Sequence, residues 1–581
     1  MNRTTKLLTA AMLGCSTLGA IPLAADDHGG THAVAHGEKP RLIVITDIGA
    51  EPDDMESFVR LLTYANDLDI EALIPSTSRH LPNRVYPFLM EERIAAYGEV
   101  LANLRVHDPA YPDTDALLTK IAPHAPLLGM EGVGEGKDTA ASRRIVEVVD
   151  KASARPVWVS IWGGAAPLAQ ALWHLRATRS AEELAAFVAK LRVYSISDQD
   201  DAGPWARAQF PQLFWIASIH GPTQYQLSTW NGISAQTPGA DQHIVSRRWL
   251  NANIRTHGPL GAAYPAPMFI MEGDTPSFLG LIPNGLNSPE NPNWGGWGGR
   301  YELVSPHAGL WSDTQDSVTG ADGQSVHDNK ATVWRWRQAF QNDFAARMDW
   351  TVSPEFADAN HAPQVVLNGK PGLEPVRIVT CAGQPVGLSA AGSSDPDGDA
   401  LAYKWWIYRE VSGLFSPETA FSATEGAETT FTIPTWTWPA DFAWPDTFDF
   451  HVILEATDDG SPALTSYRRA IVSVPLKGDA CPPIETMSVA HDIKPGDTIS
   501  SHVPQPSANG WSLAEASLGD LAGDPAAREI VDRHLPGLIS AAGANPVARI
   551  FLIETIRQFD PRITDEIVKM IDAELTELPK R

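Results

Sequence analysis

Short, wholly apolar runs alternate with amphipathic segments over residues 41–218, and this alternation constrains the fold more than any other feature. The runs are typical of strands that are buried on both faces, and the apolar spacing between them predicts helices. Strands that alternate with helices predict an α/β domain with a doubly wound, mostly parallel sheet. Ligands of such sheets bind beyond the carboxyl ends of the strands. The predicted strands are 41–46, 70–74, 156–161, 191–197 and 213–218, and the clearest helices are 54–66, 84–104 and 168–175.

The chain has 581 residues, which is too long for one hydrophobic core and predicts several domains. We place the α/β domain at 39–352, with a Gly-, Pro- and Trp-rich part after residue 220. Residues 363–478 contain short alternating runs between turn clusters, which predict an all-β sandwich of the immunoglobulin-like type. A Pro-rich linker is expected at 482–510. Residues 511–581 predict a small α-helical module, in which Asp524 and Asn545 each precede a proline as helix caps.

The N-terminus resembles an export signal. A basic start and an apolar stretch precede the small residues Leu23-Ala24-Ala25, so we expect a signal peptide at 1–25 and a disordered linker at 26–38. The protein is then exported, either periplasmic or extracellular. An alternative is a lipoprotein attached through Cys15, which follows Leu13-Gly14. No other stretch is long and apolar enough to span a membrane.

Cysteine content and charge limit the partners further. Cys381 and Cys481 lie near the two ends of the predicted sandwich, where an oxidising compartment favours a disulfide; two unpaired buried thiols are the alternative. With 44 basic and 70 acidic residues, the net charge is −26. This charge repels nucleic acid polymers and anionic membranes, and it suits neutral ligands or cations.

The strongest chemical signal is the acidic loop DIGAEPDD at 47–54, which follows the first strand and precedes a helix. Its four carboxylates repel one another unless a cation lies among them, and clustered oxygen ligands are typical of calcium. A helix cap is the competing interpretation, with Asp53 as N-cap and Glu56 completing a capping box. That interpretation accounts for one carboxylate of the four.

Other polar and aromatic residues follow the later strands. Acidic residues at the end of 191–197 lie at the same sheet edge as the acidic loop, either as a solvated turn or as sugar and acid–base ligands. Histidines after the fifth strand suit protonation of a leaving group, and tryptophans suit stacking on sugar faces, although most tryptophans pack in cores. The candidate ligand-binding residues are Asp198, Asp200, Asp201, Trp205, His220, Trp294 and Trp297, with Trp230 and His243 as further candidates.

The predicted sandwich contains the turn SSDPDGDAL at 393–401, with acidic residues at alternate positions 395, 397 and 399. It resembles the turn of secreted polycystic-kidney-disease-like and immunoglobulin-like modules. Calcium binding and an ordinary Asp/Gly turn both remain open for this segment.

The stretch TDIGAEPDDMESFVRLLTYANDLDIEALI at 46–74 resembles the start of a nucleoside hydrolase. It is more similar still to the secreted nucleoside-hydrolase-like domain of the cellulose-binding protein family. WGGAAPLAQALW at 162–173, SISDQDDAGPW at 195–205 and EGDTPSFLGLIPNGLN at 272–287 extend the resemblance over roughly 40–350. The predicted sandwich and C-terminal module also resemble the usual companions of this domain.

This resemblance implies N-glycosidic hydrolysis with calcium held by an aspartate loop. Asp47, Asp53 and Asp54 match the first aspartate and the final aspartate pair of the family's loop, with Asp47 and Asp54 as expected calcium ligands. Ala166 matches a residue that offers its backbone carbonyl, and Asp274 is the candidate for the distant ligand. The middle aspartate, which is a ligand and the general base in true nucleoside hydrolases, falls on Gly49. Glu51 or Asp53 is therefore the expected catalytic base.

Two functions follow from these patterns. The first is a secreted, calcium-dependent hydrolase of N- or O-glycosidic bonds, acting on plant or algal carbohydrate. The alternative is a non-catalytic extracellular carbohydrate- or cellulose-binding protein, which the missing carboxylate at Gly49 favours. A purely structural role is disfavoured, because clustered carboxylates are costly without a function.

Overall fold

The computed structural model describes most of the chain: residues 38–305, 307–320, 323–412, 419–435, 438–439, 445–477, 481–482, 486–487, 507–539, 551–557, 560 and 562–580. The predicted signal peptide, the lipoprotein site at Cys15 and nearly all of the linker 26–38 lie outside the described residues. The same holds for the cap at Asn545 and for most of the linker 482–510.

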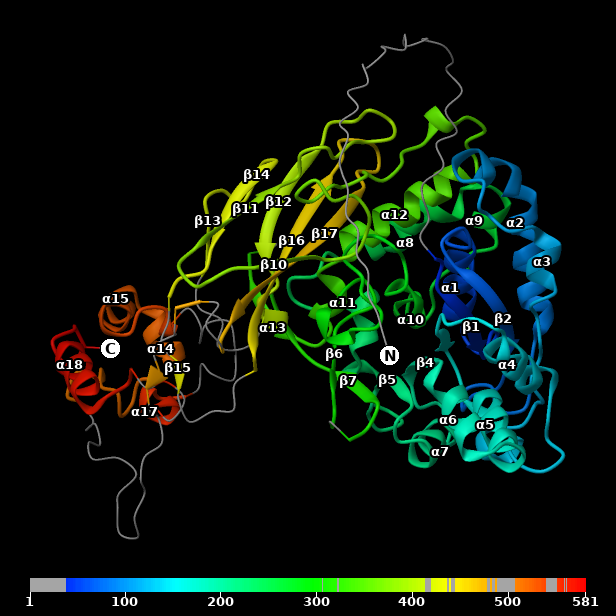
Figure 1. Ribbon diagram of the computed structural model, residues 1–581, viewed down its shortest axis with the longest axis horizontal. Coiled ribbons are helices and arrows are strands. Elements are labelled where there is room, and N and C mark those ends of the chain that lie inside the picture. Colours follow the sequence, from blue (N-terminus) through cyan, green and yellow to red (C-terminus); the bar gives the residue numbers. More distant parts are fainter. Residues whose placement is uncertain are drawn as a thin grey trace, which may run out of the picture. The chain divides into compact units, whose positions relative to one another are not determined.

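A seven-stranded sheet forms the centre of the N-terminal region (Figure 1). Neighbouring strands are parallel except for the edge strand β6, so the sheet is mixed. All five predicted strands are confirmed, and the short strands β6 and β7 were not predicted. In spatial order the strands are β2 (Asp69–Pro75), β1 (Arg41–Thr46), β3 (Val157–Ile161), β4 (Leu191–Ser197), β5 (Phe214–Ser218), β7 (Leu310–Asp313) and β6 (Tyr301–Leu303).

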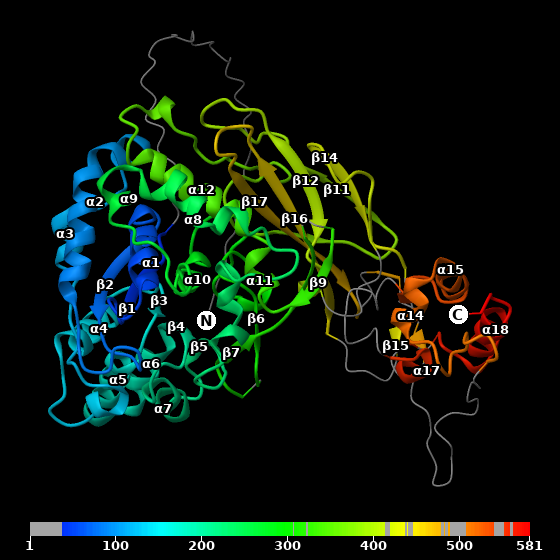
Figure 2. The ribbon, with the colours of Figure 1, turned by 180° about the vertical axis from the view of Figure 1, so that it is seen from behind.

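Helices cover both faces of this sheet, as Figures 1 and 2 show from opposite sides. Leu42 and Val44 of β1 belong to one buried cluster, and Ile43 and Ile45 belong to another, so β1 is buried on both faces. The first cluster includes residues of α1 (Pro52–Thr63), α2 (Pro87–His107), α3 (Thr114–Leu118), α10 (Pro276–Leu279), α11 (Ala331–Trp334) and α12 (Arg337–Trp350). The second includes residues of α4 (Ala140–Asp150), α5 (Ala166–Thr178), α6 (Ala181–Ala189) and α7 (Ala202–Gln209).

Strand order places a topological switch beside β1. The chain passes from β1 to β2 on one side, and the next strand, β3, pairs with the other side of β1. The loops that follow β1 and β3 therefore leave the sheet in different directions, and the space between them is where open α/β sheets bind ligands. The acidic loop follows β1 at this point.

Two further sheets follow in the chain. The larger has the order β10-β17-β16-β12 and the smaller β11-β14-β13, and residues of both, such as Trp405 and Phe431, share one buried core. β10 is parallel to β17, whereas the other pairs of these two sheets are antiparallel, and the immunoglobulin-like assignment stays a prediction. The strands are β10 (Val376–Val379), β11 (Pro385–Ser389), β12 (Ala402–Ile407), β13 (Ala420–Phe421), β14 (Glu428–Thr432), β16 (Thr447–Thr457) and β17 (Thr465–Pro475).

A disulfide joins Cys381 to Cys481, with their Cα atoms 5.4 Å apart. The bonded alternative of the two is thus confirmed. Towards the C-terminus, α14 (Leu518–Gly523), α15 (Pro525–His534), α17 (Ile553–Ile556) and α18 (Asp565–Leu575) share a buried core of their own. The predicted cap at Asp524 is confirmed, because its Oδ1 accepts hydrogen bonds from Ala526 N and Ala527 N. Within the described parts of the chain, no helix has the length and apolarity needed to cross a bilayer.

Candidate functional site

The acidic loop leads directly into α1. The helix begins at Pro52, a residue suited to the first helical position, and Asp53 and Asp54 lie in the first turn, where the helix dipole favours negative charge. The competing interpretation of a capping box is wrong. Glu51, not Asp53, is the N-cap residue and its side chain makes no cap hydrogen bond, while the buried Glu56 accepts a hydrogen bond from Glu272 N at 3.0 Å.

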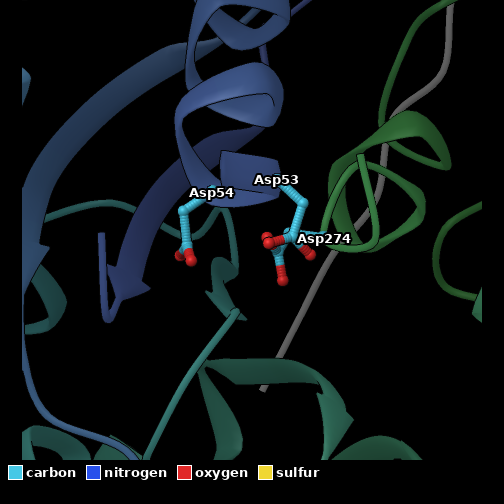
Figure 3. Close-up of side chains that lie close together, drawn as sticks. All are labelled: Asp53, Asp54 and Asp274. Carbon is cyan, nitrogen blue, oxygen red and sulfur yellow. The ribbon is translucent and has the colours of Figure 1, made fainter. Parts of the chain in front are cut away.

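Three carboxylates converge at the start of α1. One oxygen each of Asp53, Asp54 and Asp274 lies within 4.8 Å of the others, and all three side chains are buried (Figure 3). Asp274 comes from the loop before α10, far along the chain from the other two. The expected convergence of Asp274 with the acidic loop is therefore confirmed as geometry, whereas its role as a metal ligand stays a prediction.

Asp47 lies beside this triad rather than in it. Its Oδ2 accepts a hydrogen bond from the hydroxyl of Ser78, and Asp54 Oδ1 accepts one from the hydroxyl of Thr46. The charge of Asp47 contributes, after burial, to the raised pKa values of Asp53, Asp54 and Asp274. We expected Asp47 to converge with Asp54 and Asp274, but Asp53 does so instead. Asp47 stays a candidate ligand.

The electrostatics of the triad favour a cation. Burial raises the pKa of Asp53 and of Asp47 to about 7, and it raises the pKa values of Asp54 and Asp274 well above their usual range. Among the described residues, no hydrogen-bond donor reaches the buried atoms Asp53 Oδ1 and Asp274 Oδ2. Such oxygens are hard, anionic ligands, and a hard divalent cation such as calcium fits this donor set.

The loop that carries Asp274 is held by a buried ion pair. Glu272 has a left-handed backbone, with φ at 53°, and its carboxylate lies 2.6 Å from Arg60 Nε and accepts a hydrogen bond from Tyr264. A Cβ atom on Gly273 would lie 2.8 Å from Asp53 Oδ2 and 3.0 Å from the ring of Trp230. A side chain at position 273 would therefore have to displace the Asp53 carboxylate or the Trp230 ring.

Two glycines after β3 allow further carboxylates to approach. A Cβ atom on Gly163 would collide with the Asp47 carboxylate, and one on Gly164 would collide with that of Asp200. Asp200 accepts hydrogen bonds from Ala166 N and Ala202 N, at 3.3 and 2.9 Å, and burial raises its pKa to about 6. The structure thus brings Asp200 to the edge of the site.

The Ala166 carbonyl was expected to bind calcium. Ala166 is the first residue of α5, and its amide, not its carbonyl, faces Asp200. Carbonyl groups of a first helical turn point along the helix toward its C-terminal end. The expected bond from the Ala166 carbonyl to calcium stays a prediction.

The other acidic residues of the second cluster are engaged elsewhere. Asp198 forms a two-point ion pair with Arg207 of α7, at 2.7 and 2.9 Å, and Asp201 Oδ1 accepts a hydrogen bond from Met130 N at 2.8 Å. Trp205 packs against Phe210 and under the Arg176 guanidinium. Asp198, Asp201 and Trp205 thus make contacts that hold α5, α7 and the neighbouring loop together.

His220 belongs to a hydrogen-bond chain whose direction is fixed. The indole of Trp230 can only donate, and it donates to Ser197 Oγ at 3.1 Å. His220 Nδ1 donates to Gly221 O at 2.7 Å, because a carbonyl only accepts, so Nε2 of the neutral ring accepts from the Ser197 hydroxyl at 2.7 Å. In the neutral ring both nitrogens are thus engaged, and protonation of a leaving group by His220 stays a prediction.

The structure also corrects the expected ligand contact of Trp297, whereas that of the partly exposed Trp294 stays a prediction. Trp297 is 2% exposed and packs against Phe340 and Tyr467, so neither ring face is open to a sugar. Trp294 packs against His451 and under the Arg469 guanidinium. Both rings join the α/β domain to the larger of the two following sheets.

Some residues of the site were not predicted from the sequence. Ser78 and His80 follow β2, and His80 lies between Glu51 and Tyr225: its Nδ1 is 3.9 Å from Glu51 Oε1 and its Nε2 is 3.3 Å from the Tyr225 hydroxyl. Tyr225 also packs edge-on against His220. The one available signal was the position of Ser78 and His80 beyond the carboxyl end of a strand.

Two family models match the chain. Residues 41–301 match the model described as cellulose-binding Sde182, nucleoside hydrolase-like domain. Residues 385–474 match that of the cellulose-binding protein Sde0182, C-terminal domain. No protein with a curated description matches the chain.

Seven chains of solved structures match. One is a nucleoside hydrolase-related hypothetical protein from Saccharophagus degradans that is associated with carbohydrate metabolism; the likeness covers 75% of this chain and 100% of that chain, with 34% identity and a TM-score of 0.63. The YadV chaperone is 12% identical over 20% of this chain and 55% of its own, with a TM-score of 0.14, so no argument rests on it.

Proposed function

Because the chain belongs to the cellulose-binding Sde182 family with a nucleoside-hydrolase-like domain, we propose that its acidic loop binds calcium in a hydrolase of N- or O-glycosidic bonds. The proposed substrate class is plant or algal carbohydrate. The observation that carries the proposal is the buried triad of Asp53, Asp54 and Asp274, with two oxygens that lack a donor among the described residues.

In this proposal each residue has a defined task. Asp53, Asp54 and Asp274 hold the cation, with Asp47 as a further ligand. A bound divalent cation would acidify a water molecule and orient sugar hydroxyl groups. Glu51 would accept the proton of the attacking water, because its side chain is 37% exposed at the rim of the loop, beside His80. Asp53 is the second candidate base, since one of its oxygens has no donor within the described chain.

A second function is supported by a specific observation. Gly49 has a φ of 100°, and the side chains of Tyr86 and Leu89 fill the space beside its Cα. The position that matches the middle aspartate of the family's motif thus offers no carboxylate and no room for one. This favours a cation-dependent carbohydrate-binding protein that does not cleave its ligand.

The proposed location is outside the cytoplasm. The disulfide between Cys381 and Cys481 supports an oxidising compartment. The export signal predicted at 1–25 is consistent with this proposal, and cell fractionation of the full-length chain would test it.

The test is hydrolysis and binding of nucleosides and plant or algal oligosaccharides, measured with calcium and after its removal. We expect calcium-dependent turnover in the native protein and none in Asp54→Ala. Asp198→Ala is the matched control, because Asp198 is paired with Arg207 and is expected to keep turnover. Calcium-dependent binding without turnover would select the binding function, and calcium-independent binding would contradict both.

A further inference from the structure

Two acidic turns meet outside the candidate site, at residues 395–400 before β12 and 458–464 between β16 and β17. Each turn holds one aspartate through a single carboxylate oxygen. Asp395 Oδ1 accepts hydrogen bonds from Asp397 N and Asp399 N, at 2.8 and 3.2 Å. Asp458 Oδ1 accepts them from Gly460 N and Leu464 N, at 3.0 and 2.9 Å. These bonds are sufficient to form the turns.

The second oxygen of each carboxylate, Oδ2, takes no part in the hydrogen bonds of the turns. Asp395 Oδ2 and Asp458 Oδ2 are sealed from solvent, and neither has a hydrogen-bond partner within the described chain. The same is true of Asn360 Oδ1. Asp458 and Asn360 are 4% and 6% exposed. An ordinary Asp/Gly turn accounts for the Oδ1 atoms and leaves these three buried acceptors unexplained.

Hydrogen bonds and charge link the segments that carry the three acceptors. Asn360 Nδ2 donates to Asp458 Oδ1 at 3.1 Å and to Pro462 O at 2.8 Å, so its amide lies against the Asp458 carboxylate. Ala400 N donates to Asp459 Oδ1 at 2.8 Å, which brings the two turns into contact. The charge of Asp395 contributes, after burial, to the raised pKa of Asp458.

No cationic side chain of the described residues compensates this charge. Among the described residues, no ion pair reaches Asp395, Asp399, Asp458 or Asp459, and only Asp397 of these turns is paired, with His361 at 2.9 Å. A buried carboxylate oxygen without a partner costs free energy, which a bound cation would recover.

We propose that a calcium ion binds between these two turns, held by Asp395 and Asp458 through Oδ2 and by Asn360 through Oδ1. Calcium suits the set because it accepts carboxylate and amide oxygens together, in irregular geometry, and completes its shell with water. Magnesium suits it less, because it demands octahedral geometry and gives up water reluctantly. This site is independent of the acidic loop and of any catalysis there.

The proposed ion has a structural consequence. Asn360 lies between α12 and β10. Its backbone carbonyl, unlike its side-chain Oδ1, accepts a hydrogen bond, from Trp350 Nε1 at 2.9 Å. The ion would therefore tie the segment that follows the α/β domain to two turns of the larger sheet region. Calcium is expected to protect this segment from proteolysis.

The experiment is calorimetric titration of the full chain with calcium after metal removal. We expect about two ions per chain in the native protein and about one in both Asp395→Asn and Asp458→Asn. Asn keeps the size of the side chain and an oxygen for the backbone donors, and cooperative unfolding of each variant checks that it folds. Asp446→Asn is the control, because Asp446 is exposed on the same region and paired with Lys477; it should keep both ions.

Asp274→Asn separates this proposal from the proposed function. If it lowers the count by one ion and leaves the ion that Asp458→Asn removes, both sites stand. A single ion that Asp458→Asn removes and Asp274→Asn does not would support this site and contradict the acidic-loop site. An unchanged count in both Asp395→Asn and Asp458→Asn would overturn the present inference.

Discussion

Tyr86 occupies the space in which a side chain at position 49 would lie: a Cβ atom on Gly49 would be 2.7 Å from Tyr86 Cδ2. Leu89 closes the same space, at 2.8 Å from its Cδ1. The acidic loop is therefore built around a glycine, and a carboxylate at this position cannot simply be restored by substitution.

The first prediction concerns Gly49→Ala. Left-handed backbone and overpacking each cost about 1–3 kcal/mol, so we expect the free energy of unfolding to fall by about 3 kcal/mol in urea titrations. Gly136→Ala is the control, because Gly136 has a φ of 73° and open space around it; it should lose about 1 kcal/mol. If both variants lost the same free energy of unfolding, the side chains of Tyr86 and Leu89 would be shown to move aside without an energetic cost.

The second prediction concerns the catalytic base. Glu51→Gln keeps the shape of the side chain and removes the base, so we expect turnover to fall by about 100-fold or more while carbohydrate and calcium binding persist. Unchanged turnover would exclude Glu51 and leave Asp53 as the base to test. Asp53→Asn differs in its expected outcome, because it should weaken calcium binding as well as turnover.

The third prediction is a dependence of calcium stabilisation on pH. Without metal, the folded protein keeps protons on Asp47 and Asp53 up to about pH 7, whereas the unfolded chain loses them near its usual value of 3.8. As the pH rises from 3.8 to about 7, these two groups therefore lower the free energy of unfolding of the metal-free protein. Calcium offsets this loss, because it binds the carboxylates in place of their protons.

Calcium should accordingly raise the melting temperature of metal-depleted protein more at about pH 8 than at about pH 5. Scanning calorimetry at both pH values measures this difference, which should be smaller in the control variant Asp274→Asn, because only the ion at the second proposed site remains there. An equal rise at both pH values would mean that calcium does not displace protons from buried carboxylates.

The fourth prediction assigns Asp198 to stability. Its two-point pair with Arg207 is partly buried, so Asp198→Asn should lower the free energy of unfolding by about 1 kcal/mol without changing carbohydrate affinity. Asp200→Asn should instead weaken ligand or cation binding, because Asp200 faces the acidic loop. Titration calorimetry and urea unfolding of both variants distinguish the two roles; reduced carbohydrate affinity in Asp198→Asn would restore its expected ligand role.

Much of the fold could be predicted because β1 is buried on both faces and reads as a continuous apolar run. The edge strands β6 and β7 carry mixed side chains and gave no such signal. The position of Asp53 and Asp54 followed from the order of strand, loop and helix. The start of α1 was predicted too late, because Pro52 takes the first helical position and moves the cap to Glu51.

The rest of the site depends on contacts between distant segments. Asp274 could be proposed only from resemblance, and nothing local in the sequence indicated that His80 and Tyr225 would meet beside Glu51. Trp297, in contrast, was predicted to bind ligand and does not. A Trp-rich loop suits both a ligand cleft and a domain contact, and the ring of Trp297 is buried against Tyr467.

A crystal structure of the protein grown with calcium is the direct test of the proposed acidic-loop site. We expect one ion bonded to Asp53, Asp54 and Asp274, with oxygen distances of about 2.3–2.6 Å and water in the open positions. A structure at the same calcium concentration with no ion there, and with Asp53 and Asp274 sharing a proton in a direct hydrogen bond, would contradict it.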